Sequence, residues 1–253
     1  HMDAIGVKEF GDDGRVVGMR LFLGLFTSLA YSRSPRAIPL LRQKVQKAMT
    51  RAGFAPQSHD GKALLHILDT FPRDELFQIS DDDLFETAMG ILHLQERQRI
   101  ALFLRRDPFD RFVSALVYVP RDRYSTDLRL AFAKILEDAC RGTVSAFYTQ
   151  LDESVLARIH FIIRTERGRV PRFDPAAIER QLAEAGRTWA DKLREAAPEL
   201  MARWGNAFPT TYRERTDTRE AIEDIAIAEE VLAGAPLGLR LYQRPEGLSF
   251  KLF

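Results

Sequence analysis

An apolar run that ends at the start of a helix constrains this chain more than any other segment. Residues 112–126 read FVSALVYVPRDRYST, in which the apolar stretch stops at Pro120 and helix-starting residues follow from Ser125. A buried strand that leads directly into a helix is typical of domains that combine a sheet with covering helices. Two arginines, Arg121 and Arg123, lie in the turn between them.

Residues 99–196 show a regular order of strands and helices. Hydrophobic periodicity predicts strands at 99–106, 111–119, 143–151 and 155–165, and helices at 126–140 and 175–196. If the order is read from residue 111 and the strand 99–106 is placed last, it becomes βαββαβ, which is the order of a ferredoxin-like unit. The strand 99–106 then takes the edge position that the last strand of such a unit occupies. The sequence therefore predicts an α+β fold, in which a four-stranded antiparallel sheet carries two helices on one face.

The segments on either side are predicted to form further modules. A hairpin over 4–29, which turns at Gly11-Asp12-Asp13-Gly14, and helices at 35–52, 62–70 and 81–96 make a smaller α+β block over 3–98. The ferredoxin-like domain covers 99–197, a helical connector with an acidic helix at 218–232 covers 198–235, and a hairpin over 236–253 opens another module. Because an isolated two-stranded hairpin is only marginally stable, we expect more chain on both sides.

Composition argues against several classes of function. The 37 basic and 36 acidic residues leave a net charge of +1, so the chain as a whole has no electrostatic preference for nucleic acid or an anionic membrane. Cys140 is the single cysteine, which excludes an internal disulfide and fits a reducing compartment, with the cytoplasm as the expected location. No apolar run approaches the roughly 20 residues of a membrane-spanning helix.

No motif predicts catalysis, metal binding or nucleotide binding. The histidines lack HExxH or paired spacing, the glycines form neither GxGxxG nor GxxxxGK[ST], and GxSxG does not occur. The acidic group at 81–83 begins a predicted helix, where the helix dipole alone favours negative charge. We therefore predict no catalytic residue, no cofactor-binding residue and no metal ligand in this sequence.

The turn after the buried strand is the one candidate ligand or interface site. Arg121, Arg123, Tyr124 and Thr126 lie where the free N–H groups of a helix N-terminus could bind an anion together with a guanidinium. The carboxylate of an amino acid or keto acid would suit such a site. The alternatives are a contact between subunits, and a structural turn in which the arginines pair with nearby carboxylates and Thr126 caps the helix.

An RNA-binding sheet is a remote alternative. Basic residues are interleaved with Phe103, Phe109, Phe112 and Tyr118, and some ferredoxin-like sheets stack bases on exposed aromatic rings. The glycine and aromatic signature of the RNA-recognition motif is missing, and the near-zero net charge argues against this function.

Three long phrases resemble one family. GLFTSLAYSRSPRAIPLLRQKV at 24–45, FVSALVYVPRDRYST at 112–126 and LDESVLARIHFIIRT at 151–165 closely resemble the N-terminal regulatory half of the large bacterial NAD-specific glutamate dehydrogenases. The resemblance covers nearly the whole chain. It implies a PAS-like region in the first block, an ACT-like module over 99–197, and the start of a further ACT-like module over 236–253.

The resemblance also implies a function. Members of this family oxidatively deaminate L-glutamate to 2-oxoglutarate and ammonia with NAD as cofactor, and they form homotetramers. Their nicotinamide-binding and glutamate-binding motifs match nothing in this sequence, so no catalytic residue is carried over. The expected role is a non-catalytic regulatory and oligomerisation segment whose partners are other copies of the chain and a separate catalytic half. The alternative is an ACT-type module that binds an amino acid.

Overall fold

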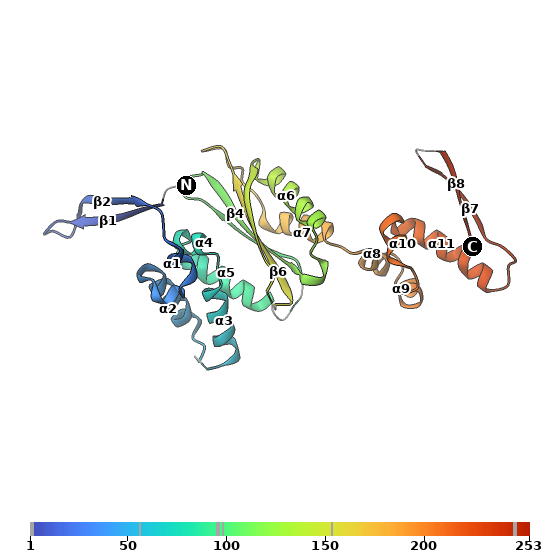
Figure 1. Ribbon diagram of the computed structural model, residues 1–253, viewed down its shortest axis with the longest axis horizontal. Helices are drawn as coiled ribbons and strands as arrows, with labels where there is room; N and C mark the ends of the chain where they lie inside the picture. Colours follow the sequence, from blue (N-terminus) through green and yellow to red (C-terminus); the bar gives the residue numbers. More distant parts are fainter. Residues whose placement is uncertain (1–2, 56, 95–96, 98, 153, 245–246) are drawn as a thin grey trace. The chain divides into compact units, whose positions relative to one another are not determined.

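The computed structural model describes residues 3–253 apart from 56, 95–96, 98, 153 and 245–246. The described chain divides into two compact units, of which the first comprises residues up to 121 and 136–175, and the second comprises 122–135 and 176–253. Helix α6 (Thr126–Cys140) contributes to both units. The fold is α+β, and its described strands form antiparallel sheets of two, four and two strands (Figure 1).

The first unit is built around the four-stranded antiparallel sheet. Its strands are β3 (Ala101–Arg106), β4 (Phe112–Pro120), β5 (Thr143–Gln150) and β6 (Leu156–Arg164), in the order β3-β4-β6-β5. This is the order that the cyclic reading of the sequence predicted, with β3 at the edge beside β4. The predicted ferredoxin-like arrangement of the strands is confirmed.

Strand β4 is buried on both of its faces. Alternate residues of a strand point to opposite sides of the sheet, and Val117 on one side and Leu116 and Tyr118 on the other are all buried. Leu116 and Tyr118 belong to a hydrophobic core that also contains side chains of the preceding helices. The sequence predicted the two helices of the ferredoxin-like unit on one face, and the apolar run without alternation in β4 is the pattern expected of burial on two faces.

Four helices supply the rest of this core. They are α2 (Pro39–Ala52), α3 (His59–Asp69), α4 (Arg73–Gln78) and α5 (Asp81–Leu94). Their fully buried leucines include Leu41, Leu64, Leu68, Leu76 and Leu84. The same cluster includes Ala101 and Leu156 of the sheet, so the predicted division between 3–98 and 99–197 runs through one continuous core.

Helix α2 begins later than the sequence predicted. The Oγ atom of Ser34 accepts a hydrogen bond from the backbone N–H of Arg36 at 3.3 Å, but this caps only a short 3-10 turn, η1 (Pro35–Ala37). The α-helix starts at Pro39, and it ends as predicted at Gly53, whose φ of 67° lies in the left-handed region that glycine favours. The predicted end of the third helix, residue 96, lies outside the described residues.

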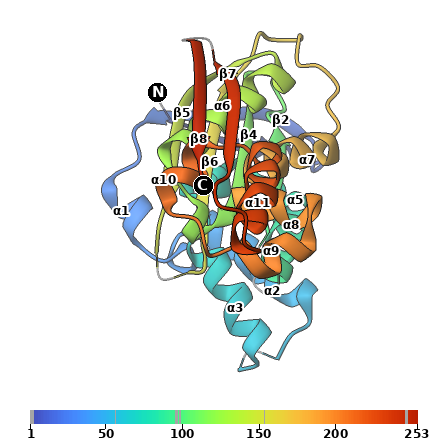
Figure 2. The same cartoon turned by 90° about the vertical axis from the view of Figure 1, so that its right-hand side faces the viewer.

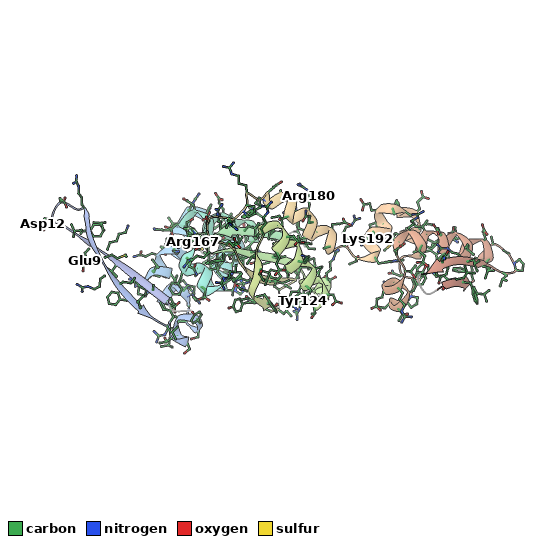
Figure 3. The ribbon with its side chains drawn as sticks, turned by 90° about the horizontal axis from the view of Figure 1, so that it is seen from above. Glu9, Asp12, Tyr124, Arg167, Arg180 and Lys192 are labelled. Carbon is green, nitrogen blue, oxygen red and sulfur yellow. The ribbon has the colours of Figure 1, made fainter. Side chains whose placement is uncertain are left out.

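The predicted N-terminal hairpin is present, and both of its faces are exposed. It pairs β1 (Asp3–Phe10) with β2 (Val16–Gly24), and short helix α1 (Ser28–Ser32) follows where the prediction continued the strand. Apolar side chains are about half exposed on each face, with 48% for Ile5 on one and 53% for Leu21 on the other. Glu9 and Asp12 lie toward the turn of this hairpin (Figure 3).

Short helices and a second hairpin make up most of the second unit. They are α7 (Pro175–Ala185), α8 (Trp189–Ala196), α9 (Pro198–Trp204), α10 (Thr210–Arg215), α11 (Thr218–Leu232), β7 (Leu239–Arg244) and β8 (Gly247–Leu252), shown in Figure 2. The prediction of a single helix over 175–196 is wrong. Thr188 and Asp191 form a capping box, which begins α8 as a separate helix after α7. The predicted helical connector over 198–235 contains α9, α10 and α11.

Candidate functional site

The described residues contain no group of three or more histidine, cysteine, aspartate or glutamate side chains placed to hold a metal ion. Among the same residues, no helix has the length and apolar character needed to cross a membrane. Cys140 is buried, and burial raises the pKa of its thiol to about 11, so it has no nucleophilic character at neutral pH. Charged side chains gather instead in the turn after β4, between α4 and the sheet, and between α11 and the C-terminal hairpin.

The turn after β4 is the predicted ligand site. Both of its arginines interact with acceptor groups of the protein. Residues 121–123 form a single 3-10 turn, η2. The Nη1 atom of Arg121 donates to the backbone oxygen of Asp152 at 2.6 Å, and the Nη1 atom of Arg123 lies 2.8 Å from the carboxylate of Asp191. Contacts with protein acceptors are expected of a structural turn, but these acceptors lie farther along the chain than the nearby carboxylates that were predicted.

Ser125, rather than Thr126, caps helix α6. The Oγ atom of Ser125 accepts a hydrogen bond from the backbone N–H of Leu128 at 3.1 Å, while Thr126 is exposed as the first helical residue. Tyr124 is half-buried; Figure 3 labels it. The structure therefore brings the four predicted residues into one turn, and their role as an effector or interface site stays a prediction.

A buried polar cluster lies between α4 and the sheet. Arg105 of β3 donates through Nε and Nη2 to the two carboxylate oxygens of Glu75 on α4, with the Nη2 bond at 2.9 Å. Arg158 of β6 donates to the backbone oxygen of Thr70 at 2.9 Å, just before α4 begins. Two guanidiniums on the sheet thus fix the position of α4.

His160 lies on the same face of the sheet as Arg158. Its Nε2 atom is 2.8 Å from the Oγ atom of Ser114, and both side chains are buried. Burial lowers the pKa of His160 to about 4, so its ring is neutral at physiological pH. The contact with Ser114 identifies His160 as a buried, hydrogen-bonded structural residue. Sequence reasoning did not identify Ser114 as its partner.

Two of the four aromatic residues that suggested base stacking, Phe103 and Tyr118, belong to the interior of the first unit. Tyr118 is buried, and Phe103 packs against the hydrophobic core, where the two rings meet edge to face with centroids 6.0 Å apart. Arg105 is engaged with Glu75. Phe103, Tyr118 and Arg105 therefore cannot stack or contact bases, whereas Phe109 is 60% exposed in the turn before β4.

Asp224 organises the second unit. This residue of α11 is fully buried, and it accepts hydrogen bonds from the Tyr212 hydroxyl, from Arg240 Nη1 at 2.6 Å and from Lys251 Nζ. Burial would raise the pKa of Asp224, but the hydrogen bonds from Lys251, Tyr212 and Arg240 outweigh burial and lower it. The ionised carboxylate thus holds β7 and β8 against α11.

Asp224 was not predicted from the sequence, although a signal was available. Arg240 and Lys251 are cross-strand partners on one face of the β7–β8 hairpin, and an acidic helix precedes them. On the other face, Leu241 pairs with Phe250, and these two side chains are 60% and 68% exposed. The hairpin therefore turns its charged face to the helix and leaves its apolar face uncovered by the described residues.

Three family models match the chain, and all three describe the same enzyme. The ACT2 domain of glutamate dehydrogenase matches residues 101–190, helical motif 1 of glutamate dehydrogenase matches 38–97, and helical motif 2 matches 194–231. The chain belongs to the glutamate dehydrogenase family. Its four-stranded sheet with α6 and α7 corresponds to the ACT2 domain, and α2 to α5 correspond to helical motif 1, within the block predicted as PAS-like.

Named relatives of this chain agree with the family models. The chain is 44% identical, over 99% of its length, to the NAD-specific glutamate dehydrogenase of Halomonas elongata. The identities are 38% over 95% of the chain for the Pseudomonas aeruginosa protein of that name, and 36% over 90% for that of Mycobacterium tuberculosis. The chain spans only 16%, 15% and 15% of the lengths of these relatives. The resemblance found in the sequence is confirmed.

Proposed function

We propose that the chain is a non-catalytic regulatory and oligomerisation segment of an NAD-dependent glutamate dehydrogenase, an enzyme that oxidatively deaminates L-glutamate to 2-oxoglutarate and ammonia. The observation that carries this proposal is the ACT2 match, which spans all four strands of a sheet with ferredoxin-like order. NAD would bind to the catalytic part of the whole cytoplasmic enzyme. Its binding motifs have no counterpart in this sequence.

The exposed hairpins support the assembly role. Leu23 of β2 and Phe250 of β8 are 59% and 68% exposed, and each lies among other exposed apolar side chains. Contiguous apolar patches on a protein surface mark contacts with other proteins. Other copies of the same polypeptide, in a homotetramer, and the catalytic part of the enzyme are the proposed partners.

The test separates catalysis from assembly. Purified chain is mixed with L-glutamate and NAD, and NADH formation is followed with the Pseudomonas aeruginosa enzyme as positive control. We expect no turnover by the chain, and a molecular mass by light scattering that exceeds the monomer at high concentration. Turnover would overturn the non-catalytic assignment, and a monomer at every concentration would contradict the oligomerisation role.

Amino-acid sensing is a second candidate function, which the ACT2 match favours. The turn at 121–126 is the proposed effector site. A ligand that binds only the folded chain raises the melting temperature by mass action. In a thermal-shift series over amino acids and keto acids, Arg121→Ala should leave the fold intact and remove any such rise. A flat response of the unsubstituted chain to all of them would exclude this function.

A further inference from the structure

A cavity lies where α6 passes into β5, beside the end of β6. Its volume is about 300 Å³, at the lower end of the range for pockets that bind small molecules. Thr143 and Arg164 face each other across the β5–β6 pairing and bring the two segments together. The lining residues all lie in the first unit: Arg141, Gly142, Thr143, Arg164, Thr165 and Glu166.

Arg141 and Arg164 both line this cavity, and both residues are exposed. Neither side chain makes a hydrogen bond or ion pair with any residue that the structure describes. Arg111, at the same end of the sheet, is by contrast held by both oxygens of the Asp107 carboxylate. The planar fork of a guanidinium matches carboxylate and phosphate groups, so two of them in one cavity favour an anionic ligand.

The other polar groups of the cavity leave this positive charge uncompensated. Glu166 is the one acidic residue in the lining, and its carboxylate lies 2.6 Å from the guanidinium of Arg169. The hydroxyl of Thr165 donates to the backbone oxygen of Asp110 at 3.2 Å, which leaves its oxygen able to accept a hydrogen bond. The cavity thus combines two unpaired cations with threonine hydroxyls.

Unfavourable backbone conformations gather around the same cavity. Arg141 and Asp110 have φ values of 50° and 55°, and they are the non-glycine residues with positive φ in the described chain. Glycine is the usual residue directly after a helix in this conformation, whereas arginine adopts it at a cost in free energy. A Cβ atom on Gly142 would lie 2.5 Å from the backbone oxygen of Arg164, so glycine allows the turn to approach β6 closely. Backbone strain of this kind concentrates at functional sites.

We propose that this cavity binds a small ligand with two acidic groups, either a dicarboxylate or a diphosphate, between Arg141 and Arg164. Each guanidinium takes one acidic group in a charge-assisted pair, and the hydroxyls of Thr143 and Thr165 hydrogen-bond to the remaining oxygens. The site is separate from the turn at 121–126. The proposal concerns binding alone and does not rest on the proposed function.

Calorimetric titration of the 253-residue chain with glutarate and with pyrophosphate, at fixed ionic strength, tests this site. We expect saturable binding of at least one probe, and the probe that binds more tightly identifies the acidic group. Arg164→Gln should weaken binding about tenfold or more, the effect of losing a charge-assisted hydrogen bond. Arg167→Gln, which removes the same charge from an exposed residue outside the lining (Figure 3), should leave binding unchanged. Equal weakening by both substitutions, or no binding of either probe, would overturn the proposal.

The variant Arg141→Gly separates a loss of binding from a loss of folding. Glycine accepts the left-handed conformation without strain, so this variant should melt at a higher temperature than the unsubstituted chain while its affinity for the probe falls about tenfold or more. If Arg141 had only a structural role, its substitution would not raise the melting temperature and lower the affinity for the probe at the same time. Unchanged affinity in Arg141→Gly would rule the site out.

Discussion

The carboxylate of Glu75 accepts hydrogen bonds from both Nε and Nη2 of Arg105, and the two side chains are only 4% and 9% exposed. This pair joins α4 to β3 in the interior of the first unit. Ion pairs on the surface contribute little to stability, but the loss of one partner from a buried pair leaves a charge without compensation.

Glu75→Gln should therefore destabilise the chain by about 3 kcal/mol, since the guanidinium of Arg105 would stay buried without its counter-ion. Urea unfolding measures the change. The matched control is Asp82→Asn, which breaks the exposed pair with Arg51 and should cost less than about 1 kcal/mol. A similar decrease in the free energy of unfolding in the two variants would show that the buried Glu75–Arg105 pair contributes no more to stability than an exposed pair.

Phe132→Ala should destabilise the chain by about 3 to 5 kcal/mol, because the ring is fully buried and its removal leaves a cavity. Leu130, on the same helix α6, is 53% exposed, so Leu130→Ala should change stability by no more than about 0.5 kcal/mol. Thermal and urea unfolding of both variants test the assignment of the two helix faces. The reverse order of effects would mean that these faces are inverted.

Stability should depend on pH through His160. Burial lowers its pKa from 6.5 to about 4, so the unfolded chain binds a proton between these values that the folded chain does not bind. The contribution of the neutral ring is fully present above about pH 6.5 and is lost as the pH falls toward about 4. Urea unfolding at about pH 7 and about pH 5 should show a smaller difference for His160→Gln than for the unsubstituted chain. Exposed His93 supplies the control, since His93→Gln should keep the full difference.

Asp224→Asn should loosen the β7–β8 hairpin, because Arg240 and Lys251 lose their buried common counter-ion and keep only the more exposed Glu220 as a shared partner. Hydrogen exchange should become faster in β7 and β8 and stay unchanged in β4. The pKa of Asp224 is lowered in the folded chain, so its contribution to stability is present above the ordinary carboxyl pKa of 3.8 and is lost as the pH falls below it. Unchanged exchange in the hairpin would show that other contacts hold it.

The sequence predicted a helix or strand correctly where its hydrophobic periodicity and its capping residues indicate the same bounds. Helix α6 has the predicted bounds, because Leu128, Phe132, Leu136 and Ala139 form one apolar stripe and the cap lies directly before it. Helix α4 was missed. It is only six residues long, and its end is held by a distant side chain, since Lys44 Nζ donates to the backbone oxygen of Leu76 at 3.0 Å. Such tertiary stabilisation leaves no local pattern in the sequence.

The candidate sites were less accessible to sequence reasoning. The turn at 121–126 was found because its residues are contiguous, yet the partners of Arg121 and Arg123 come from residues far along the chain. Arg141 and Arg164 meet at one cavity only through the pairing of β5 with β6. The strands were predicted, but the set of residues that line the cavity, and the lack of an acceptor for either guanidinium among the described residues, depend on the packed structure.

The burial of β4 has a consequence for how the chain opens. Eight of its nine residues are buried, and it is hydrogen-bonded on one edge to β3 and on the other to β6. Water can reach its amides only after a neighbouring strand has been peeled away. We therefore expect strands β3, β4 and β6 of the ACT2 sheet to stay paired when the segments around them unfold. Refolding can then start from these paired strands.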